Sequence, residues 1–592
     1  MDIYAWNRKD ALPEETTNKF NEILKKLGIE TFVVSEEQYN NLWFSNRIEI
    51  KGLNNIGTNG KGVTPQYTMA SALGEFMERL QSGMLIDYLY PFFNPKTDMA
   101  GDINLLADSS KKFFGDILSN YKEAELNAII NDSMVNSRSL NFIDISTNEN
   151  FLIPERLINV LCGTNGIAAG NTFEEAFVQG ISEIFERYVL QYIYKEQYSD
   201  LFKVFNESVY ENLNSYNLIR AIKERKYHVY VIDCSLNGKV PVVGVLIFDQ
   251  AKTKYYFKLG SDVNMDIALQ RCITEIFQGN SFDINFRFKM CDFYETKESE
   301  EDFWFDKYRA FEHTKAEING TGALPRGFFR CLTNETSTIR GFMLEKKGNK
   351  EAATFMVSCC NKLNKRIAIA NYTVFGVPCI RILIPELCAS YYYPGSDLKG
   401  VIENINKFYN FIVEGKLNTH EALDCLTSIL EYPAYTYEFS MNRLLCVVMK
   451  EEIGKPYIYN PYLFVAYLAI YLNELDVADK YLSKYNKEAR INDKIVKMDA
   501  MIMSGIRHNV SKQQLLEFAK LSDVKGILSA EINKIFNIKE QGMQLPCCPG
   551  CSFCSYKEVC SYPEWNKIRT KMKEQSCECC EKQLMEFIKN CH

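Results

Sequence analysis

The sequence predicts an α+β protein with three regions: a mixed α+β domain over residues 1–398, an all-α domain over residues 399–540, and a cysteine-rich tail over residues 541–592. Strand-like and helix-like runs alternate as far as about residue 395, and only helical periodicity continues to Phe536. Nine of the 20 cysteines crowd into residues 547–592. A chain of 592 residues is too long for one ordinary core, which agrees with several domains.

Individual elements follow from local patterns. Residues 14–27 predict a helix, and a short strand follows at about 31–34. Three β-branched runs bounded by turn residues predict strands at 228–233, 240–249 and 378–386. In the helical region, residues 461–485 predict a helix–turn–helix pair. Small and aromatic residues at helical spacing favour a tetratricopeptide-like repeat there, and a single irregular bundle explains them equally well.

Composition excludes several classes of protein. The hydrophobic fraction of 46% and charged fraction of 24% are typical of a globular domain. A net charge of −7 argues against a general nucleic-acid binder. No apolar run approaches the length of roughly 18 residues that a membrane span needs, and the N-terminus lacks an apolar signal core. We therefore expect a cytoplasmic protein that contacts neither membrane nor nucleic acid directly.

The first chemistry-bearing segment, TNGKGVTPQYTMASALGEFMERL, covers residues 58–80. Its glycines predict a turn at 57–62 that leads into a helix from about Pro65. Ser71, Glu75 and Glu78 follow at i, i+4 and i+7, so they share one helical face.

The second segment, TNGIAAGNTFEEAFVQGISEIFERYV, repeats this plan over residues 164–189. Thr172 or Asn171 could cap its helix, with Glu175 near the third helical position. One face carries a polar row formed by Glu175, Gln179, Glu183 and Glu186. The opposite face carries the residues that we expect a core to bury, which are Phe177, Ile181, Ile184, Phe185 and Tyr188.

Acidic residues stacked on one helical face repel one another, so two matching rows indicate a compensating cation. Magnesium fits best because it prefers oxygen ligands and is commonly shared with substrate phosphates, which the glycine turns could hold. The alternative is that both rows are solvated outer faces. A third helix, within residues 262–279, places Arg271 and Glu275 at i, i+4, where they form either a triphosphate clamp or a surface ion pair. Gly60-Lys61-Gly62 lacks the spacing of a P-loop.

These three pieces, namely TNGKG…ASALGEFMERL, NGIAAGNTFEEAFVQGISEIFERYV and ALQRCITEIFQG, closely resemble the YcaO family. The resemblance covers about residues 1–395 well and residues 400–540 in general character. It implies a YcaO-type ATP-binding domain with an internal pseudo-repeat, followed by the tetratricopeptide-like domain. It further implies an enzyme that uses ATP and magnesium to phosphorylate a peptide backbone amide oxygen, leading to an azoline, thioamide or amidine.

By position, the resemblance implies a set of magnesium ligands: Glu75, Glu78, Glu175, Glu183, Glu186 and Glu275. The implied ATP contacts are Lys9, Thr16, Ser71, Asn171, Gln179, Arg187 and Arg271, of which Lys9 and Thr16 match less closely. Partners would be a peptide or protein substrate, and a homodimer is compatible with the family. An alternative role is that of an accessory factor for methylthiolation of a small-subunit ribosomal protein, acting as an ATP-bound scaffold for a radical enzyme.

The cysteine tail reads CCPGCSFCSYKEVC over residues 547–560. Cys548, Cys551, Cys554 and Cys560 have the spacing C-x2-C-x2-C-x5-C, which in a reducing compartment favours zinc or an iron–sulfur cluster over disulfides. Its last three cysteines resemble the cluster-binding C-terminal motif of some iron–sulfur nucleases. A redox-active or disordered tail is the alternative. Such a tail could recruit a sulfur-handling partner or sense redox state.

Overall fold

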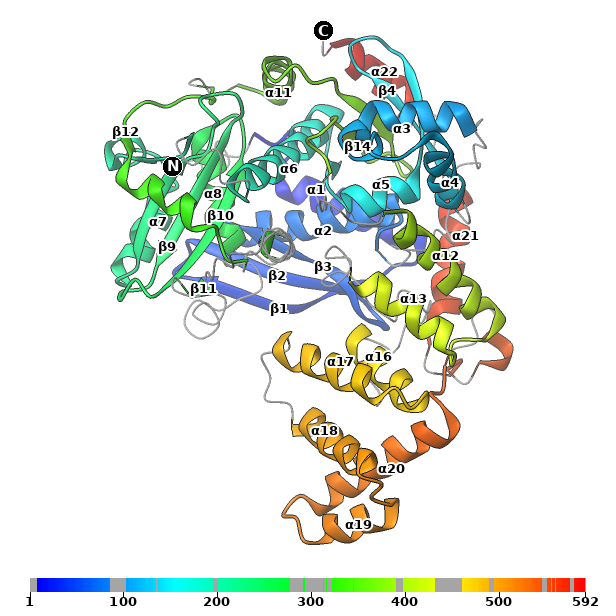
Figure 1. The fold of residues 1–592 in the computed structure, drawn as a ribbon. Helices are drawn as coiled ribbons and strands as arrows, with labels where there is room; N and C mark the ends of the chain where they lie inside the picture. Colours follow the sequence, from blue (N-terminus) through cyan, green and yellow to red (C-terminus); the bar gives the residue numbers. More distant parts are fainter. Residues whose placement is uncertain are drawn as a thin grey trace. The chain divides into compact units, whose positions relative to one another are not determined.

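Three strand–helix pairs form the centre of the fold in the computed structural model (Figure 1). In each pair, two or three residues separate the end of the strand from the start of the helix. A side chain just before each helix accepts a hydrogen bond from a first-turn amide, with distances of 3.2 Å at Thr64, 3.1 Å at Thr172 and 2.9 Å at Asn264. The pairs are β3 (Leu53–Gly62) with α2 (Pro65–Ser82), β6 (Ile167–Ala169) with α6 (Phe173–Tyr194), and β10 (Lys254–Ser261) with α8 (Met265–Ile276).

The chain divides into two compact units. Unit 1 comprises Met1–Lys51, Asn55–Ser396 and Lys567–His592, and unit 2 comprises Gly52–Asn54 and Asp397–Asn566. Among the residues that the structure describes, no helix is long and apolar enough to cross a bilayer. The described residues are 8–85, 103–134, 137–194, 201–276, 291–292, 312–313, 316, 322–343, 345, 347–389, 398–431, 460–488, 494–545, 551–554, 556–558, 560–574 and 580–590.

Each of the three strands belongs to a different sheet. The sheet orders are β1-β2-β3, β5-β4-β13-β14-β6 and β11-β10-β9-β8-β7-β12. Pairing in the two larger sheets is antiparallel except between β7 and β12. The other strands are β1 (Thr31–Tyr39), β2 (Trp43–Ile50), β4 (Ser139–Asp144), β5 (Asn150–Pro154), β7 (Lys203–Phe205), β8 (His228–Asp233), β9 (Val242–Phe248), β11 (Cys291–Asp292), β12 (Glu335–Thr336), β13 (Ala368–Asn371) and β14 (Cys379–Leu383).

The three central helices link the sheets in a cycle. Helix α2 packs against β2 of its own sheet and against β6 and β14 of the second. Helix α6 packs against β6 and β14 and reaches β9 and β10 of the third sheet, and α8 packs against β9 and β10 and reaches β2. Each helix thus contacts its own sheet and the next one, an arrangement that brings all three helices together at the middle of unit 1 (Figure 1).

Small residues let each helix approach its strand at an equivalent point. A Cβ added at Gly60 would lie 2.8 Å from Ala72 Cβ, and one added at Gly260 would lie 2.8 Å from Cys272 Sγ. In the second pair the glycine is on the helix, where a Cβ at Gly180 would lie 3.5 Å from Ala168 Cβ. In all three pairs the helix residue follows its strand partner by twelve positions. The same spacing at the same contact indicates an internal repeat with three members.

Several sequence-based expectations for single elements are confirmed, and one is wrong. The helix expected at 14–27 is α1 (Pro13–Leu27), the three expected strands are β8, β9 and β14, and the short strand at 31–34 continues as β1 to Tyr39. The Gly-rich turn expected at 57–62 is instead the end of β3. Gly57 is required there because a Cβ would lie 1.8 Å from Ile48 O on the neighbouring strand.

The remaining helices of unit 1 cover the sheets. Helix α7 packs with α8 on one face of the six-stranded sheet, over a core that includes the β-branched residues of β8 and β9. These elements are α3 (Ile103–Leu118), α4 (Glu123–Met134), α5 (Glu155–Cys162), α7 (Tyr216–Glu224), α11 (Asn349–Lys362), α22 (Cys580–Asn590) and the 3-10 segments η3 (Glu207–Val209) and η4 (Arg326–Thr333).

The C-terminal helix α22 belongs to unit 1, although unit 2 precedes it in the chain. It packs on α6, where the ring of Phe587 lies 6.3 Å from that of Phe173 and 5.2 Å from that of Phe177. Helix α11 packs along α6 as well.

The described part of unit 2 between residues 398 and 545 contains only helices. The expected helix–turn–helix pair is present as α16 (Pro461–Tyr471) and α17 (Leu475–Glu488), and α16 is buried along nearly its whole length. Whether these helices form a tetratricopeptide-like repeat stays a prediction. The others are α12 (Leu398–Glu414), α13 (His420–Leu430), α18 (Lys494–Arg507), α19 (Lys512–Lys520), α20 (Lys525–Gln541), the 3-10 segment η6 (Cys551–Phe553) and α21 (Tyr562–Glu574), which runs on into unit 1.

A buried polar network joins three of these helices. Tyr467 on α16 donates a hydrogen bond of 2.8 Å to Asp499 on α18, and Lys534 Nζ on α20 lies 3.4 Å from the same carboxylate. Asp499 is fully buried, and burial raises its pKa to about 7.

Candidate nucleotide and metal site

The first predicted polar row lies along α2. Ser71, Glu75 and Glu78 are half-buried, whereas Phe76 and Met77 on the other side of the helix are fully buried. The Ser71 hydroxyl accepts a hydrogen bond of 3.4 Å from the amide of Lys61 on β3. This face of α2 therefore looks back onto the strand that precedes it.

The second row lies along α6. Gln179, Glu183 and Glu186 are half-buried, and Glu175, at the start of the helix, is buried. The opposite face is the core face, as predicted, since Phe177, Ile181, Ile184 and Phe185 are fully buried. The prediction is wrong for Tyr188, which is only half-buried and donates its hydroxyl to Tyr192 at 3.1 Å.

Helix α8 meets α6 through an arginine. Arg271 Nη1 donates a hydrogen bond of 2.6 Å to Gln179 Oε1, and its Nη2 lies 3.7 Å from Glu186 Oε1. One turn further along, Glu275 pairs with Lys61 from β3 and, at 3.8 Å, with Lys258 from β10. The third sequence segment is thus in contact with the other two.

The internal repeat puts residues of like chemistry at equivalent positions. Counted from Gly60, Ala168 and Gly260, the eleventh following residue is Ser71, Gln179 or Arg271. The fifteenth is glutamate in every case, namely Glu75, Glu183 and Glu275. The eighteenth is Glu78 in the first pair and Glu186 in the second, and the equivalent residue of the third pair lies outside the described residues. Equivalent turns of three converging helices therefore supply polar and acidic side chains to one place.

We call this place the charge cluster. It contains five carboxylates, Glu75, Glu78, Glu183, Glu186 and Glu275, and five cations, Lys61, Arg79, Arg187, Lys258 and Arg271. Arg79 and Arg187 lie within 3.6–3.8 Å of glutamates of their own helices, which are Glu75 and Glu78 for Arg79 and Glu183 for Arg187. The formal charges of these ten side chains cancel.

Burial and neighbouring charges shift the pKa values of several side chains in the charge cluster. Burial, with Glu183 and Glu75 adding to it, raises the pKa of Glu78 to about 8, although Arg79 opposes the shift. Burial, followed by repulsion from Arg271, lowers the pKa of Lys61 to about 8. The pKa of Lys258 is lowered to about 7 by burial and by Arg187 and Lys61. Side chains of both signs are thus held in a charge state that the site stabilises poorly.

The carboxylates of the charge cluster are suitable ligands for a hard cation, but in this structure their oxygens contact lysines and arginines. Among the described residues, no three acidic, histidine or cysteine side chains converge in the way a metal site requires. The carboxylates instead face lysines and arginines, as in the pair formed by Glu183 and Arg187. Carboxylate oxygens are the ligands that Mg²⁺ prefers, so the cluster could hold it after these ion pairs separate.

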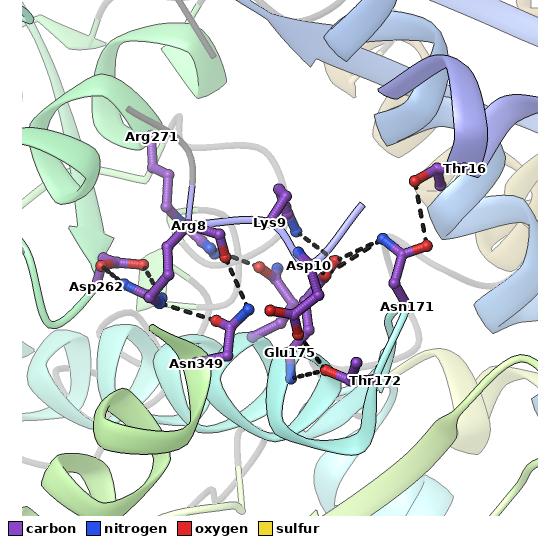
Figure 2. Close-up of polar contacts among 11 residues, drawn as sticks. Arg8, Lys9, Asp10, Thr16, Asn171, Thr172, Glu175, Asp262, Arg271 and Asn349 are labelled. Carbon is purple, nitrogen blue, oxygen red and sulfur yellow. Dashed lines mark hydrogen bonds and ion pairs between the residues drawn. The ribbon is translucent and has the colours of Figure 1, made fainter. Parts of the chain in front are cut away.

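Glu175 belongs to a separate group at the start of α6 (Figure 2). Lys9 Nζ lies 3.0 Å from Glu175 Oε1, and the amide of Asp10 donates a hydrogen bond of 3.2 Å to Oε2. Asn171 donates to the same carboxylate at 3.2 Å and accepts from Thr16 at 3.1 Å. Burial alone would raise the pKa of Glu175, but Lys9 and the hydrogen bonds outweigh it, so the pKa is lowered. The structure thus brings three of the predicted ATP contacts to one of the predicted metal ligands.

The cysteine tail is described only in part. Cys548 lies outside the described residues, as does the side chain of Cys551. The Sγ atoms of Cys554 and Cys560 are each 3.4 Å from the amide of the residue two positions later, Tyr556 and Tyr562, which donates to them. Both cysteines are buried and outside disulfides.

Sequence reasoning missed Asp10 in the group around Glu175, and Lys61, Arg79 and Lys258 in the charge cluster. The repeat could have revealed Arg79, because Arg79 and Arg187 each follow a Glu at the same position of the ExxER pattern. Lys258 carries no local signal, because it becomes a site residue only through the packing of β10.

Residues 59–388 match the model of the family described as "YcaO cyclodehydratase, ATP- and Mg²⁺-binding". This match covers more than half of the chain, and the chain belongs to the YcaO family. Its mixed helices and sheets agree with the α+β fold expected for a YcaO domain.

Among characterised sequences, the chain is similar to "Ribosomal protein S12 methylthiotransferase accessory factor YcaO" of Escherichia coli strain K12. The two are 28% identical over 414 residues, which is 66% of this chain and 67% of that protein. An uncharacterized protein of Haemophilus influenzae is 26% identical over 469 residues, 72% of each chain.

Solved structures with a similar arrangement are more distant. A heterocyclase in complex with substrate and cofactor has a TM-score of 0.42 and 15% identity over 64% of this chain, and the match spans about half, 52%, of the heterocyclase. YcaO from Methanopyrus kandleri, bound with AMPPCP and Mg²⁺, has a TM-score of 0.38 and 17% identity over 65% of this chain and 93% of that one.

Proposed function

We propose that the chain is an ATP- and Mg²⁺-dependent YcaO enzyme that activates a peptide backbone amide by O-phosphorylation. The observation that carries the proposal is the neutral charge cluster, in which five carboxylates of three equivalent helices are matched by five lysines and arginines. Six half-buried ion pairs are costly to maintain for stability alone, because desolvation offsets much of their attraction. A site in which these side chains exchange one another for a bound ligand explains why the protein keeps them together.

The exchange would give the carboxylates and the cations of the cluster new partners of opposite charge. Mg²⁺ would take the carboxylates of Glu75, Glu78, Glu183, Glu186 and Glu275, joined by Glu175 once Lys9 leaves it. The triphosphate would take the cations that those carboxylates release, with Arg271, Arg187 and Lys9 as the proposed contacts. Ser71, Gln179, Asn171 and Thr16 would add neutral hydrogen bonds. Metal–nucleotide binding would thus replace one set of ion pairs by two, one between the carboxylates and Mg²⁺ and one between the cations and the triphosphate.

Mg²⁺ would supply neutralisation of phosphate charge in this site. The lysines and arginines hold the terminal phosphoryl group in line with the substrate amide oxygen and stabilise charge on it as the bond to ADP breaks. The amide oxygen gains the phosphoryl group. A nucleophile then adds to the amide carbon, and inorganic phosphate leaves with that oxygen. The product class is a thioamide, an azoline or a related group.

The test is ATP turnover by the purified chain, with and without candidate peptides, in wild type and Glu183→Gln. We expect release of ADP and phosphate that depends on Mg²⁺ and is lost in the variant. Nucleotide that binds but is never turned over, with any peptide offered, would refute the enzyme proposal. It would favour the second candidate, an ATP-bound accessory factor that recruits a radical methylthiotransferase to a small-subunit ribosomal protein. The similarity to the E. coli accessory factor supports that candidate.

The other regions would serve partners. We assign residues 399–540 to a tetratricopeptide-like domain that binds a protein partner, and residues 541–592 to a metal- or cluster-binding tail with a sulfur-handling partner. A cytoplasmic location and a homodimer complete this proposal.

For the tail, the supporting observation is the pair of amide hydrogen bonds to the sulfurs of Cys554 and Cys560. Amides donated to sulfur stabilise the thiolate form, which is the form that binds zinc or an iron–sulfur cluster. The iron, zinc and sulfide contents of the purified protein, with its visible absorbance, decide between the two. Absence of all three from anaerobically purified protein would refute the assignment.

A further inference from the structure

The N-terminal segment before α1 is anchored by an arginine that stands beside the predicted nucleotide contact Lys9. Arg8 Nη1 and Nη2 donate to the two oxygens of Asp262 at 2.8 and 2.9 Å, and its Nε donates to Asn349 Oδ1 at 2.8 Å. Asn349 in return donates from Nδ2 to the main-chain oxygen of Arg8 at 2.8 Å. Both the side chain and the backbone of Arg8 are therefore fixed (Figure 2).

The anchor points are themselves rigid and buried. Asp262 lies in the turn between β10 and α8, where its Oδ1 also accepts the amide of Asn264 at 2.9 Å, and its side chain is 5% exposed. Asn349 is the first residue of α11 and is 4% exposed. The contact of a planar guanidinium with a carboxylate through its two terminal nitrogens is among the most directional that a protein can form.

The next two residues bind the start of α6. Lys9 and Asp10 both reach Glu175, and Asp10 contacts Thr172 as well. We call residues 8–10 the strap. It ties together the first residues of α6, the turn before α8 and the first turn of α11, and α6 and α8 also carry the charge cluster.

Lys9 could not hold this position by itself. Its side chain is 43% exposed, so side-chain entropy and solvent screening oppose the pair that it forms with the buried carboxylate of Glu175. The amide of Asp10 can donate to Glu175 only if the backbone between Lys9 and Asp10 is fixed. Arg8 is the neighbouring residue that fixes it.

We propose that Arg8 is a positioning residue for nucleotide binding: its fork on Asp262 and Asn349 fixes the strap and so keeps Lys9 at the start of α6, from where its ammonium passes from Glu175 to the triphosphate when the ligand binds. The inference rests on the proposed function, because Lys9 matters to a ligand only if the site takes Mg²⁺ and ATP. An alternative is that Arg8 merely docks the N-terminus and stabilises the fold. The two roles differ in whether the effect of Arg8 passes through Lys9.

The test is a double-mutant cycle read out as the Kd of Mg²⁺ with the non-hydrolysable analogue AMPPCP, measured by calorimetry on the full chain. We expect Arg8→Ala to weaken binding about tenfold or more, and Arg8→Lys to recover little, because an ammonium cannot form the fork. In a Lys9→Ala background, Arg8→Ala should change Kd less than about twofold. Lys112→Ala, which removes an exposed pair with Glu149 in the same unit, is the control and should bind as wild type does.

Unchanged Kd in Arg8→Ala would overturn the inference, and so would an effect of equal size with and without Lys9. Should Arg8→Ala fail to fold, Asp262→Asn keeps the side-chain shape, removes the charge of the fork and is judged by the same cycle.

A second readout needs no nucleotide. In Arg8→Ala, amide hydrogen exchange at Asp10 should become faster, with the core of α6 unchanged. Wild-type protein that binds no Mg²⁺–AMPPCP would refute the proposed function, whereas unchanged exchange at Asp10 would refute the strap itself.

Discussion

Replacing Glu183 by glutamine separates a ligand site from a structural salt-bridge network. Glu183 is 25% exposed, lies 3.6 Å from Arg187 and raises the pKa of Glu78. A pair of unit charges about 4 Å apart at an effective dielectric of about 20 attracts by about 4 kcal/mol. Partial exposure and the desolvation that each ligand requires reduce this to about 2 kcal/mol for the loss of one carboxylate from a cation site, or about 30-fold in Kd.

The same substitution should not destabilise the protein without ligand. It removes a negative charge from a crowded row, so relief of the repulsion felt by Glu78 offsets the loss of the pair with Arg187. We therefore expect Glu183→Gln to bind Mg²⁺–AMPPCP about 30-fold more weakly in calorimetry while its thermal midpoint without ligand stays the same or rises. Glu174→Gln is the control, because Glu174 lies nine residues earlier, on the opposite face of α6. A lowered midpoint together with unchanged nucleotide binding would show that the cluster is structural.

Three further predictions concern the rest of the chain. Arg138→Met should lower the free energy of unfolding of unit 1 by about 3–5 kcal/mol in urea titration, because it leaves the buried carboxylate of Glu155, now bonded at 2.7 Å, without its counter-ion. Asp499 has a raised pKa in the folded protein, so the free energy of unfolding should fall as the pH rises from 3.8 to about 7, by no more than about 1.4 kcal/mol per pH unit. In Asp499→Asn, the thermal midpoint should depend less on pH over that range. Cys554→Ser should lower the bound zinc or iron of the purified protein by at least about half, as measured by elemental analysis.

Each of these has an outcome that contradicts it. If Arg138→Met combined with Glu155→Leu is as unstable as the single variant, the stranded carboxylate is not the cause of the loss. If the thermal midpoint of the wild type rises between pH 5 and pH 7, the contribution of Asp499 to stability changes with pH in the opposite direction to the prediction. Full metal content in Cys554→Ser would remove that sulfur from the ligand set.

The helical faces could be predicted because their information is local. Ser71, Glu75 and Glu78 are spaced at helical intervals, and so are Gln179 and Glu183, so the periodicity alone places them on common faces. The same local reasoning failed for the glycines between residues 57 and 62. Their absence of side chains suggested a turn, but in β3 it permits close contact with β2 and α2.

Only part of the cationic half of the site could be predicted: Arg187 and Arg271 were expected from the family resemblance, but Lys61 and Lys258 were not. Lys258 meets Glu275 only because β10 and α8 pack together, and the fork from Arg8 to Asp262 joins residues 254 positions apart. Neither pair leaves a repeating pattern in the sequence, since tertiary packing rather than spacing creates it. The reading of Glu175 as one more member of the acidic row was incomplete for the same reason, because the strap that covers it comes from the other end of the domain.

The docking of α22 onto α6 has a consequence for how the protein is made. Phe587 packs against Phe173 and Phe177 but is synthesised about 410 residues after them. At about 5–20 residues per second, α6 waits for roughly 20–80 seconds before its aromatic face is covered. During that interval unit 2 is synthesised, while unit 1 still lacks α22 and the ring of Phe587 does not yet cover Phe173 and Phe177. Translation speed and chaperone access in this window should therefore affect the yield of active protein.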